Sequence, residues 1–296
     1  MDKLHIKIPL ILIALIQALT LFSCAKSDKE PALTTLPPVV TEGLPEKEKV
    51  TSNIKNGGFT VTVYETYAEI VAYEGEDEEL VIPDSFLGIP VKKVGEYAFY
   101  LCKKLKKVTL PEALIEIDNN AFEGCEALSE VIVGDRLEVI GMSAFRDSGL
   151  EKIELPDTVA VIEKYSFYRT KLTTFKVPAS VSLLGKYAFY GCKLLESVVF
   201  TPRLSTLGEY CFHDCTALKE MVIPETITKI GDYCFRGCSN LEKLFIPKRT
   251  ELGENVFLSC NALTIYTPKG SKAEAMAKKW HYSYKSCSTP DKMTEN

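Results

Sequence analysis

The chain has 296 residues, of which 46% are hydrophobic and 25% are charged, and its formal net charge is −5 at pH 7. This apolar content is ample for a folded core. The negative charge argues against nucleic acid as a direct partner, because proteins that bind nucleic acid present basic surfaces.

Residues 1–23 have the pattern of a secretory signal peptide. Lys3 and Lys7 precede an apolar run from Ile8 to Phe22, which is too short for a stable membrane span. The run ends at Leu-Phe-Ser-Cys, residues 21–24, which resembles the bacterial lipobox. That resemblance implies that Cys24 is diacylated and becomes the new N-terminus. The alternative is an ordinary signal peptide followed by an unrelated cysteine.

Residues 24–53 follow as a predicted disordered tether, because they are rich in Lys, Glu, Pro and Thr and have few large apolar groups. In residues 54–79, polar and apolar side chains mostly alternate between Phe59 and Val71. This alternation predicts one or two strands. We expect them to form an N-terminal β cap, since the open end of a stack of repeats needs a cover.

From residue 80 to residue 266, a phenylalanine recurs every 22 or 23 residues. The eight positions are Phe99, Phe122, Phe145, Phe167, Phe189, Phe212, Phe235 and Phe257. A period in the twenties is typical of a solenoid, in which each repeat is one coil stacked on the last. We therefore predict a solenoid of about eight coils, with the phenylalanines stacked in its core.

The coils share a skeleton around that phenylalanine. It reads L-x-x-φ-x-φ-P, about six further residues, then φ-G-x-x-[AC]-F-x-x-C, where φ is apolar. The alternation predicts a strand, which a proline such as Pro224 ends. The glycine four residues before the phenylalanine, for example Gly231, is expected at a tight bend. Stacked coils would pair these strands in a parallel sheet.

This pattern, best seen in IGDYCFRGC (residues 230–238) and VGEYAFYLC (residues 94–102), resembles the BspA-like leucine-rich repeats of bacterial surface proteins, the Treponema pallidum-type variant. The resemblance extends over about Leu80 to Tyr266. It implies a mostly β leucine-rich-repeat solenoid, without catalysis, that binds proteins or mediates adhesion. The coils depart from the pattern where Asp118 and Glu163 replace the glycine, and where Ser148 and Thr170 replace the cysteine.

Residues 267–296 are predicted to form a helical C-terminal cap and tail. Ser271 and Glu274 have the spacing of a capping box. Ala273, Met276, Ala277 and Trp280 follow at the spacing of an apolar helical stripe, so we expect a short helix that covers the last coil.

The ten cysteines are mostly explained by the repeat. Six occupy the slot three residues after the phenylalanine, namely Cys102, Cys125, Cys192, Cys215, Cys238 and Cys260. We interpret them as small buried apolar groups. Disulfide bonding is not what the slot requires, because Ser148 and Thr170 also fill it. Neighbouring coils are close enough that oxidation stays an alternative.

Four cysteines have the spacing C-x3-C-x18-C-x3-C, at Cys211, Cys215, Cys234 and Cys238. This spacing is compatible with a zinc site, but the repeat period also produces it. Cys211 with His213 is a conceivable nucleophile pair, although residues two apart in a turn seldom face each other. No other catalytic motif is present, so we expect no catalytic, cofactor or metal residues.

The outward side of the predicted sheet offers a candidate binding site. The fifth residue of L-x-x-φ-x-φ points outward in each coil, giving the column Thr109, Ile132, Glu154, Lys176, Val199, Val222 and Phe245. We call Ile132, Val199, Val222 and Phe245 the apolar strip. An exposed apolar strip indicates a partner-binding site, unless strand propensity alone selected these residues.

The sequence therefore predicts an exported, lipid-anchored protein of a bacterial outer membrane or cell surface. The family resemblance implies that its partners are host extracellular matrix proteins or other bacterial surface proteins, and the lipid would attach it to the membrane. The alternatives are a structural or assembly lipoprotein that faces the periplasm, a cysteine-dependent enzyme and a zinc-binding protein.

Overall fold

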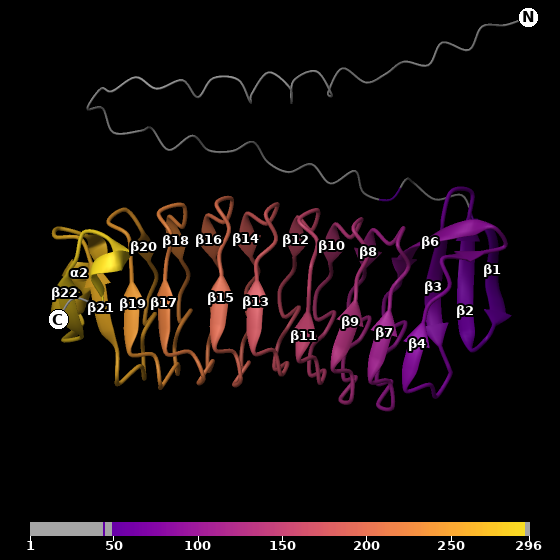
Figure 1. Ribbon diagram of the computed structural model, residues 1–296, viewed down its shortest axis with the longest axis horizontal. Coiled ribbons are helices and arrows are strands. Elements are labelled where there is room, and N and C mark those ends of the chain that lie inside the picture. Colours follow the sequence, from indigo (N-terminus) through magenta and orange to yellow (C-terminus); the bar gives the residue numbers. More distant parts are fainter. Residues whose placement is uncertain (1–43, 45–48, 294–296) are drawn as a thin grey trace, which may run out of the picture. The chain divides into compact units, whose positions relative to one another are not determined.

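The computed structural model describes residue 44 and residues 49–293, and most of this part is a stack of parallel coils (Figure 1). Each coil contributes one strand to a front row and one shorter strand to a back row. The front row consists of β4 (Glu79–Val81), β7 (Lys107–Thr109), β9 (Glu130–Ile132), β11 (Lys152–Ile153), β13 (Thr174–Lys176), β15 (Ser197–Val199), β17 (Glu220–Val222), β19 (Lys243–Phe245), β21 (Thr264–Thr267) and β22 (Ser283–Ser286). The solenoid and the mostly β class predicted from the repeat are confirmed.

The back row was not predicted from the sequence. Its strands lie just before the glycine slot: β6 (Ile89–Val94), β8 (Glu116–Ile117), β10 (Val139–Ile140), β12 (Val161–Ile162), β14 (Leu183–Leu184), β16 (Thr206–Leu207), β18 (Lys229–Ile230) and β20 (Glu251–Leu252). Most of these strands have only two residues, too few to show an alternating pattern. They form one uninterrupted parallel sheet from β6 to β20, whereas the front row is divided into three sheets.

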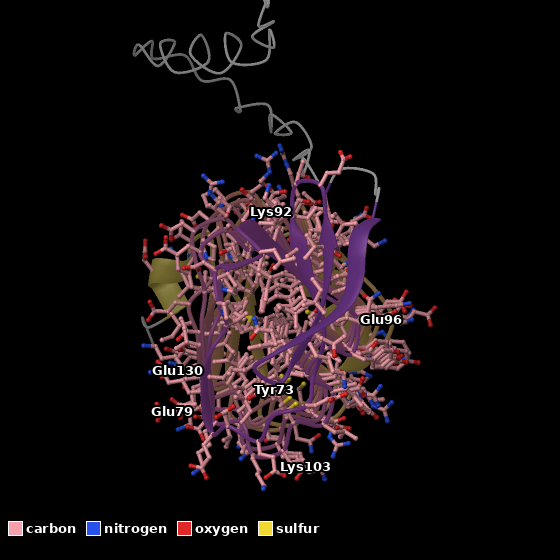
Figure 2. All side chains as sticks on the ribbon, turned by 90° about the vertical axis from the view of Figure 1, so that its right-hand side faces the viewer. Tyr73, Glu79, Lys92, Glu96, Lys103 and Glu130 are labelled. Carbon is pink, nitrogen blue, oxygen red and sulfur yellow. The ribbon has the colours of Figure 1, made fainter. Side chains whose placement is uncertain are left out.

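The phenylalanine column fills the space between the two rows. All eight rings are fully buried. Consecutive rings stack face to face, with centroids 4.8–6.1 Å apart and interplanar angles of 5–20°. Figure 2 views the stack from its N-terminal end. Glu79 and Glu130 project from the front row and Glu96 from the opposite side, so charged groups surround the apolar interior.

The glycine slot serves a different purpose from the predicted bend. Gly231 does not have a left-handed φ. A Cβ at Gly231 would lie 2.6 Å from the backbone nitrogen of Glu209 in the preceding coil, and Gly141 and Gly185 are equally constrained. The slot therefore favours glycine because adjacent coils approach closely. The left-handed residues come two positions later, for example Tyr187 with φ 61° and Tyr210 with φ 54°.

The cysteine slot three residues after the phenylalanine is buried, as predicted, in every coil except the first, where Cys102 is only partly buried, and it also has a polar role. The Sγ atoms of Cys125, Cys192, Cys215, Cys238 and Cys260 donate to the phenylalanine carbonyl of the preceding coil at 2.9–3.1 Å. Thr170, in the same slot, donates to the carbonyl of Phe167 at 3.1 Å. Most residues of the slot thus combine a small side chain with a hydrogen bond to a backbone carbonyl, whereas the buried Oγ of Ser148 has no such partner. The nine cysteines from Cys102 onward are free thiols.

The N-terminal end of the stack is closed by β1 (Lys49–Asn56), β2 (Phe59–Tyr64) and β3 (Ala68–Tyr73). These strands pair antiparallel with one another, and β3 then pairs parallel with β6, so they extend the back sheet. A short strand, β5 (Ser85–Phe86), pairs antiparallel with β6. Because β1 begins at Lys49, the predicted boundary of the tether at residue 53 is too late. The predicted signal peptide, Cys24 and most of the tether lie outside the described residues.

The C-terminal end is closed by the helix α2 (Lys272–Trp280), as predicted. Ser271 caps it by accepting a hydrogen bond from the backbone N–H of Glu274 at 2.9 Å. Ala273 and Ala277 are buried against the last coil, but Trp280 is 59% exposed, so the predicted stripe does not extend to it. The chain then adds β22 beside β21 and a 3-10 helix, η2 (Pro290–Met293).

Candidate protein-binding face

Three members of the apolar strip lie where the sequence places them. Ile132 is 41% exposed, Val199 is 58% exposed and Val222 is 44% exposed. The strand register aligns the same column, with Thr109 opposite Ile132 and Lys176 opposite Val199. Exposed apolar side chains on consecutive coils, Val199 and Val222, therefore give the front row an exposed apolar region.

The predicted exposure of Phe245 is wrong, because this side chain is only 2% exposed. The register prediction was correct, since Phe245 is aligned with Val222 on one side and with Tyr266 on the other. The C-terminal tail covers it. Phe245, Tyr266 and Cys287 form a separate apolar cluster on the outer side of the front row. The backbone N–H of Cys287 donates to the carbonyl of Thr267 at 2.9 Å, which holds the tail in place.

This cover leads to a testable prediction for the tail. Phe245→Ala removes the ring beneath Cys287, so we expect the tail to detach while the coils stay folded. The Cys287 thiol, now 6% exposed, should react with a thiol reagent at least about ten times faster. Val199→Ala, two coils away in the same outward column, is the matched control and should leave the rate unchanged. An unchanged rate in Phe245→Ala would show that the ring does not hold the tail.

The front row is interrupted between β15 and β17. These strands belong to separate sheets, and no backbone hydrogen bond among the described residues joins them. The inward slots beside the interruption, Val198 and Phe200, are only partly buried. In the next coil, the residues in the same slots, Met221 and Ile223, are buried. Phe200 occupies a slot that holds Leu, Val or Ile in the other coils. The second interruption, between β11 and β13, has the aliphatic Leu155 in this slot, so ring size alone does not explain both interruptions.

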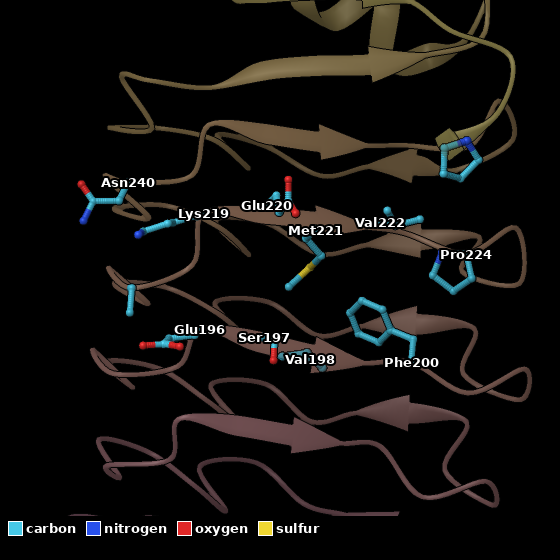
Figure 3. A pocket seen from close by; sticks show the side chains of 12 residues that line it. Glu196, Ser197, Val198, Phe200, Lys219, Glu220, Met221, Val222, Pro224 and Asn240 are labelled. Atoms are coloured by element: carbon cyan, nitrogen blue, oxygen red, sulfur yellow. The ribbon is translucent and has the colours of Figure 1, made fainter. Parts of the chain in front are cut away.

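A groove of about 940 Å³ opens at this interruption. Figure 3 shows that its two ends differ. Phe200, Val222 and Pro224 lie where the strands end, whereas Glu196 and Lys219 lie where the strands begin. Met221 points from β17 toward β15. The groove therefore combines one apolar end with one charged end, beside the exposed Val199. We call it the seam groove.

The electrostatics of the front row are those of a solvated surface. Lys107 and Glu130, on adjacent strands, form an ion pair at 2.8 Å. The hydrogen bond from Lys107 holds the pKa of Glu130 below its usual value. Such exposed pairs contribute little to stability. These pairs place positive and negative side chains next to each other, so they do not give the front row a strong charge of one sign.

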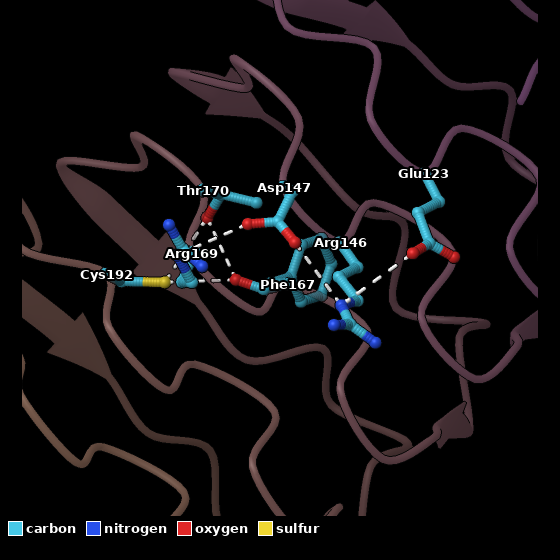
Figure 4. A network of polar contacts seen from close by, with 7 residues as sticks. All are labelled: Glu123, Arg146, Asp147, Phe167, Arg169, Thr170 and Cys192. Carbon is cyan, nitrogen blue, oxygen red and sulfur yellow. Dashed lines mark hydrogen bonds and ion pairs between the residues drawn. The ribbon is translucent and has the colours of Figure 1, made fainter. Parts of the chain in front are cut away.

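The turns on the side of the cysteine slot carry ordered polar and aromatic groups. Figure 4 shows Arg146 between Glu123 and Asp147, and Arg169 bound to the other oxygen of Asp147 at 3.2 Å. Tyr165, Tyr187, Tyr210 and Tyr233 stack in one column, with centroids 4.7–4.8 Å apart. Because their faces contact one another, these rings pack together and do not offer flat surfaces to a ligand.

The geometry gives the enzyme alternative no support at Cys211. The side chain is 0% exposed, and burial raises the pKa of its thiol, so at neutral pH it is protonated. His213 is stacked on Tyr190 with the ring centroids 4.5 Å apart. Burial lowers the pKa of that imidazole.

The zinc alternative rests on the four cysteines Cys211, Cys215, Cys234 and Cys238, all of which are buried as predicted. Within residues 49–293, no group of three or more His, Cys, Asp or Glu side chains has the geometry of a metal site. The Sγ atoms of Cys215 and Cys238 are engaged with backbone carbonyls. The repeat period is therefore sufficient to explain the spacing.

This geometry defines a leucine-rich-repeat solenoid, and leucine-rich repeats generally mediate protein–protein interactions. The family described as "BspA type Leucine rich repeat region (6 copies)" matches residues 78–194 and 161–287. The chain belongs to this family of repeat scaffolds, whose members are not known as enzymes.

Solved structures of leucine-rich repeat proteins are similar to this chain. A leucine-rich repeat protein of T. pallidum is 25% identical, with a TM-score of 0.55, and the match covers 80% of this chain and 100% of that chain. A leucine-rich repeat protein from Bacteroides ovatus is 21% identical, with a TM-score of 0.46 and coverage of 77% and 71%. Among curated proteins, none matches this chain. No helix in residues 49–293 is long and apolar enough to cross a membrane.

Proposed function

We propose that this protein is an exported, lipid-anchored scaffold of a bacterial cell surface, and that its solenoid binds other proteins through the front row. The observation that carries the binding role is the exposed pair Val199 and Val222 beside the seam groove. An apolar region of this kind on a repeat scaffold is typical of a protein interface. Host matrix proteins and surface proteins of other bacteria are the proposed partners.

Adhesion of whole cells tests the binding role. Cells that display the full chain should bind immobilised matrix proteins or partner bacteria, and a Val199→Asp, Val222→Asp double variant should bind them much less. Leu183→Asp is the matched control, because Leu183 is 50% exposed and lies on the back-row strand β14. Equal loss in Leu183→Asp, or no loss in the double variant, would contradict binding through the front row.

The proposed lipid anchor rests on Cys24 after an apolar run that ends in Leu-Phe-Ser. We expect mass spectrometry of the mature N-terminus to find a diacylglyceryl cysteine, and Cys24→Ser to move the protein into the soluble fraction. A Cys24→Ser variant that stays in the membrane, together with an unmodified wild-type N-terminus, would rule the anchor out.

The side of the envelope that the protein faces needs a separate test. A protease added to intact cells should cleave the protein if it faces outward. Complete protection in intact cells, with cleavage after the outer membrane is permeabilised, would favour the periplasm-facing structural or assembly lipoprotein.

A further inference from the structure

At the seam groove, as at the other interruption of the front row between β11 and β13, the strands lack the backbone partners that they have within each sheet. The N–H of Val177 donates to the carbonyl of Val199 at 2.9 Å, and that of Ile223 donates to the carbonyl of Phe245 at 3.0 Å. Phe200 has the same place in its coil, yet no backbone bond links it to Val222 among the described residues. Backbone donors and acceptors of β15 and β17 are therefore free to bond water or a ligand.

The side chains of the groove define what such a ligand looks like. Phe200, Val222 and Pro224 form the apolar end, and Met221 lies between the two strands. Methionine adapts its shape to different apolar partners. Glu196 and Lys219 carry both signs of charge at the other end. A groove with an apolar end, a polar end and free backbone groups suits an extended polypeptide segment.

The chain itself already places one of its own segments on this face, namely the start of the 3-10 helix η2 at Pro290. The tail that covers Phe245 continues to Pro290, and Pro290 lines the seam groove together with Val222 and Pro224. The groove is thus continuous with a surface on which a proline-containing segment is docked. A proline at this position loses little entropy on binding, because its φ angle is fixed before it binds.

We propose that the seam groove binds a short, extended, proline-containing apolar segment of a partner protein, next to the site occupied by Pro290. The apolar residues of that segment contact Phe200, Val222 and Pro224, and its backbone bonds the free groups of β15 and β17. This inference rests on the proposed function, since it specifies how the front row recognises a partner.

A library of random short peptides displayed on phage, selected on the full chain, tests the proposal. We expect the selected peptides to be apolar and rich in proline, and to bind at least about ten times more weakly to Val222→Asp. Val222→Ile should bind them as the wild type does, because it keeps the apolar contact. Leu183→Asp, on the back row, should also bind them normally.

Other outcomes overturn the proposal in distinguishable ways. Peptides that bind Val222→Asp normally but do not bind Ile132→Asp would place the binding site elsewhere on the front row. The proposed function would not be affected. If no peptide is selected while the double variant still abolishes adhesion, the face recognises a folded surface. If the full chain forms dimers that Val222→Asp dissociates, the occupant is a second copy. If none of the variants reduces adhesion, the proposed function is contradicted as well.

Discussion

Phe189→Ala is expected to lower the free energy of unfolding by about 3–5 kcal/mol. The ring is fully buried and lies between Phe167 and Phe212, with centroids 5.3 and 5.4 Å away. Phe175 contacts it edge-on at 4.7 Å. Removing a ring with close neighbours on three sides leaves a cavity that a stack of rigid coils is unable to refill. Denaturant unfolding measures the loss.

The matched control is Leu194→Ala, in the turn that follows Phe189. Leu194 is 51% exposed, so this variant should change the free energy of unfolding by no more than about 0.5 kcal/mol. Since each coil is stabilised by its neighbours, hydrogen exchange in Phe189→Ala should also increase in the flanking coils. A loss below about 1 kcal/mol would mean that the phenylalanine column does not hold the coils together.

The regular part of this fold is predictable because every coil repeats the same local requirements. The period locates Phe99 to Phe257 in the core, and the alternation in L-x-x-φ-x-φ separates inward from outward residues. The same alternation correctly exposes Ile132, Val199 and Val222. The capping box at Ser271 gives the start of the helix. Each of these features depends on residues near in sequence or one period away.

The features that the sequence did not predict depend on contacts between residues that are not related by the repeat period. Phe245 satisfies the outward pattern, but a tail from beyond the last coil returns to cover it. The seam groove lies beside Phe200, an aromatic side chain in a slot that is aliphatic in the neighbouring coils. This substitution was visible in the sequence and could have drawn attention to this coil.

Asp118 shows that a departure from the repeat can have its own partner. It stands in the glycine slot, and its carboxylate lies 2.6 Å from the Nζ of Lys93, which also contacts Glu116 at 2.9 Å. Lys93 is 8% exposed. Its burial alone would lower the pKa of this amine, but the hydrogen bonds to Asp118 and Glu116 outweigh burial and raise it. The amine is therefore charged and is held between two carboxylates.

Lys93→Met is accordingly expected to cost about 2–3 kcal/mol of unfolding free energy, somewhat less than a fully buried ion pair, because both carboxylates stay about one-fifth exposed. Adding Asp118→Gly restores the usual glycine and removes one unpaired charge, so the double variant should recover part of the loss. Lys104→Met is the control, since Lys104 pairs with Glu76 in solvent and should matter little. Additive losses for Lys93→Met and Asp118→Gly would show that the two residues are not coupled.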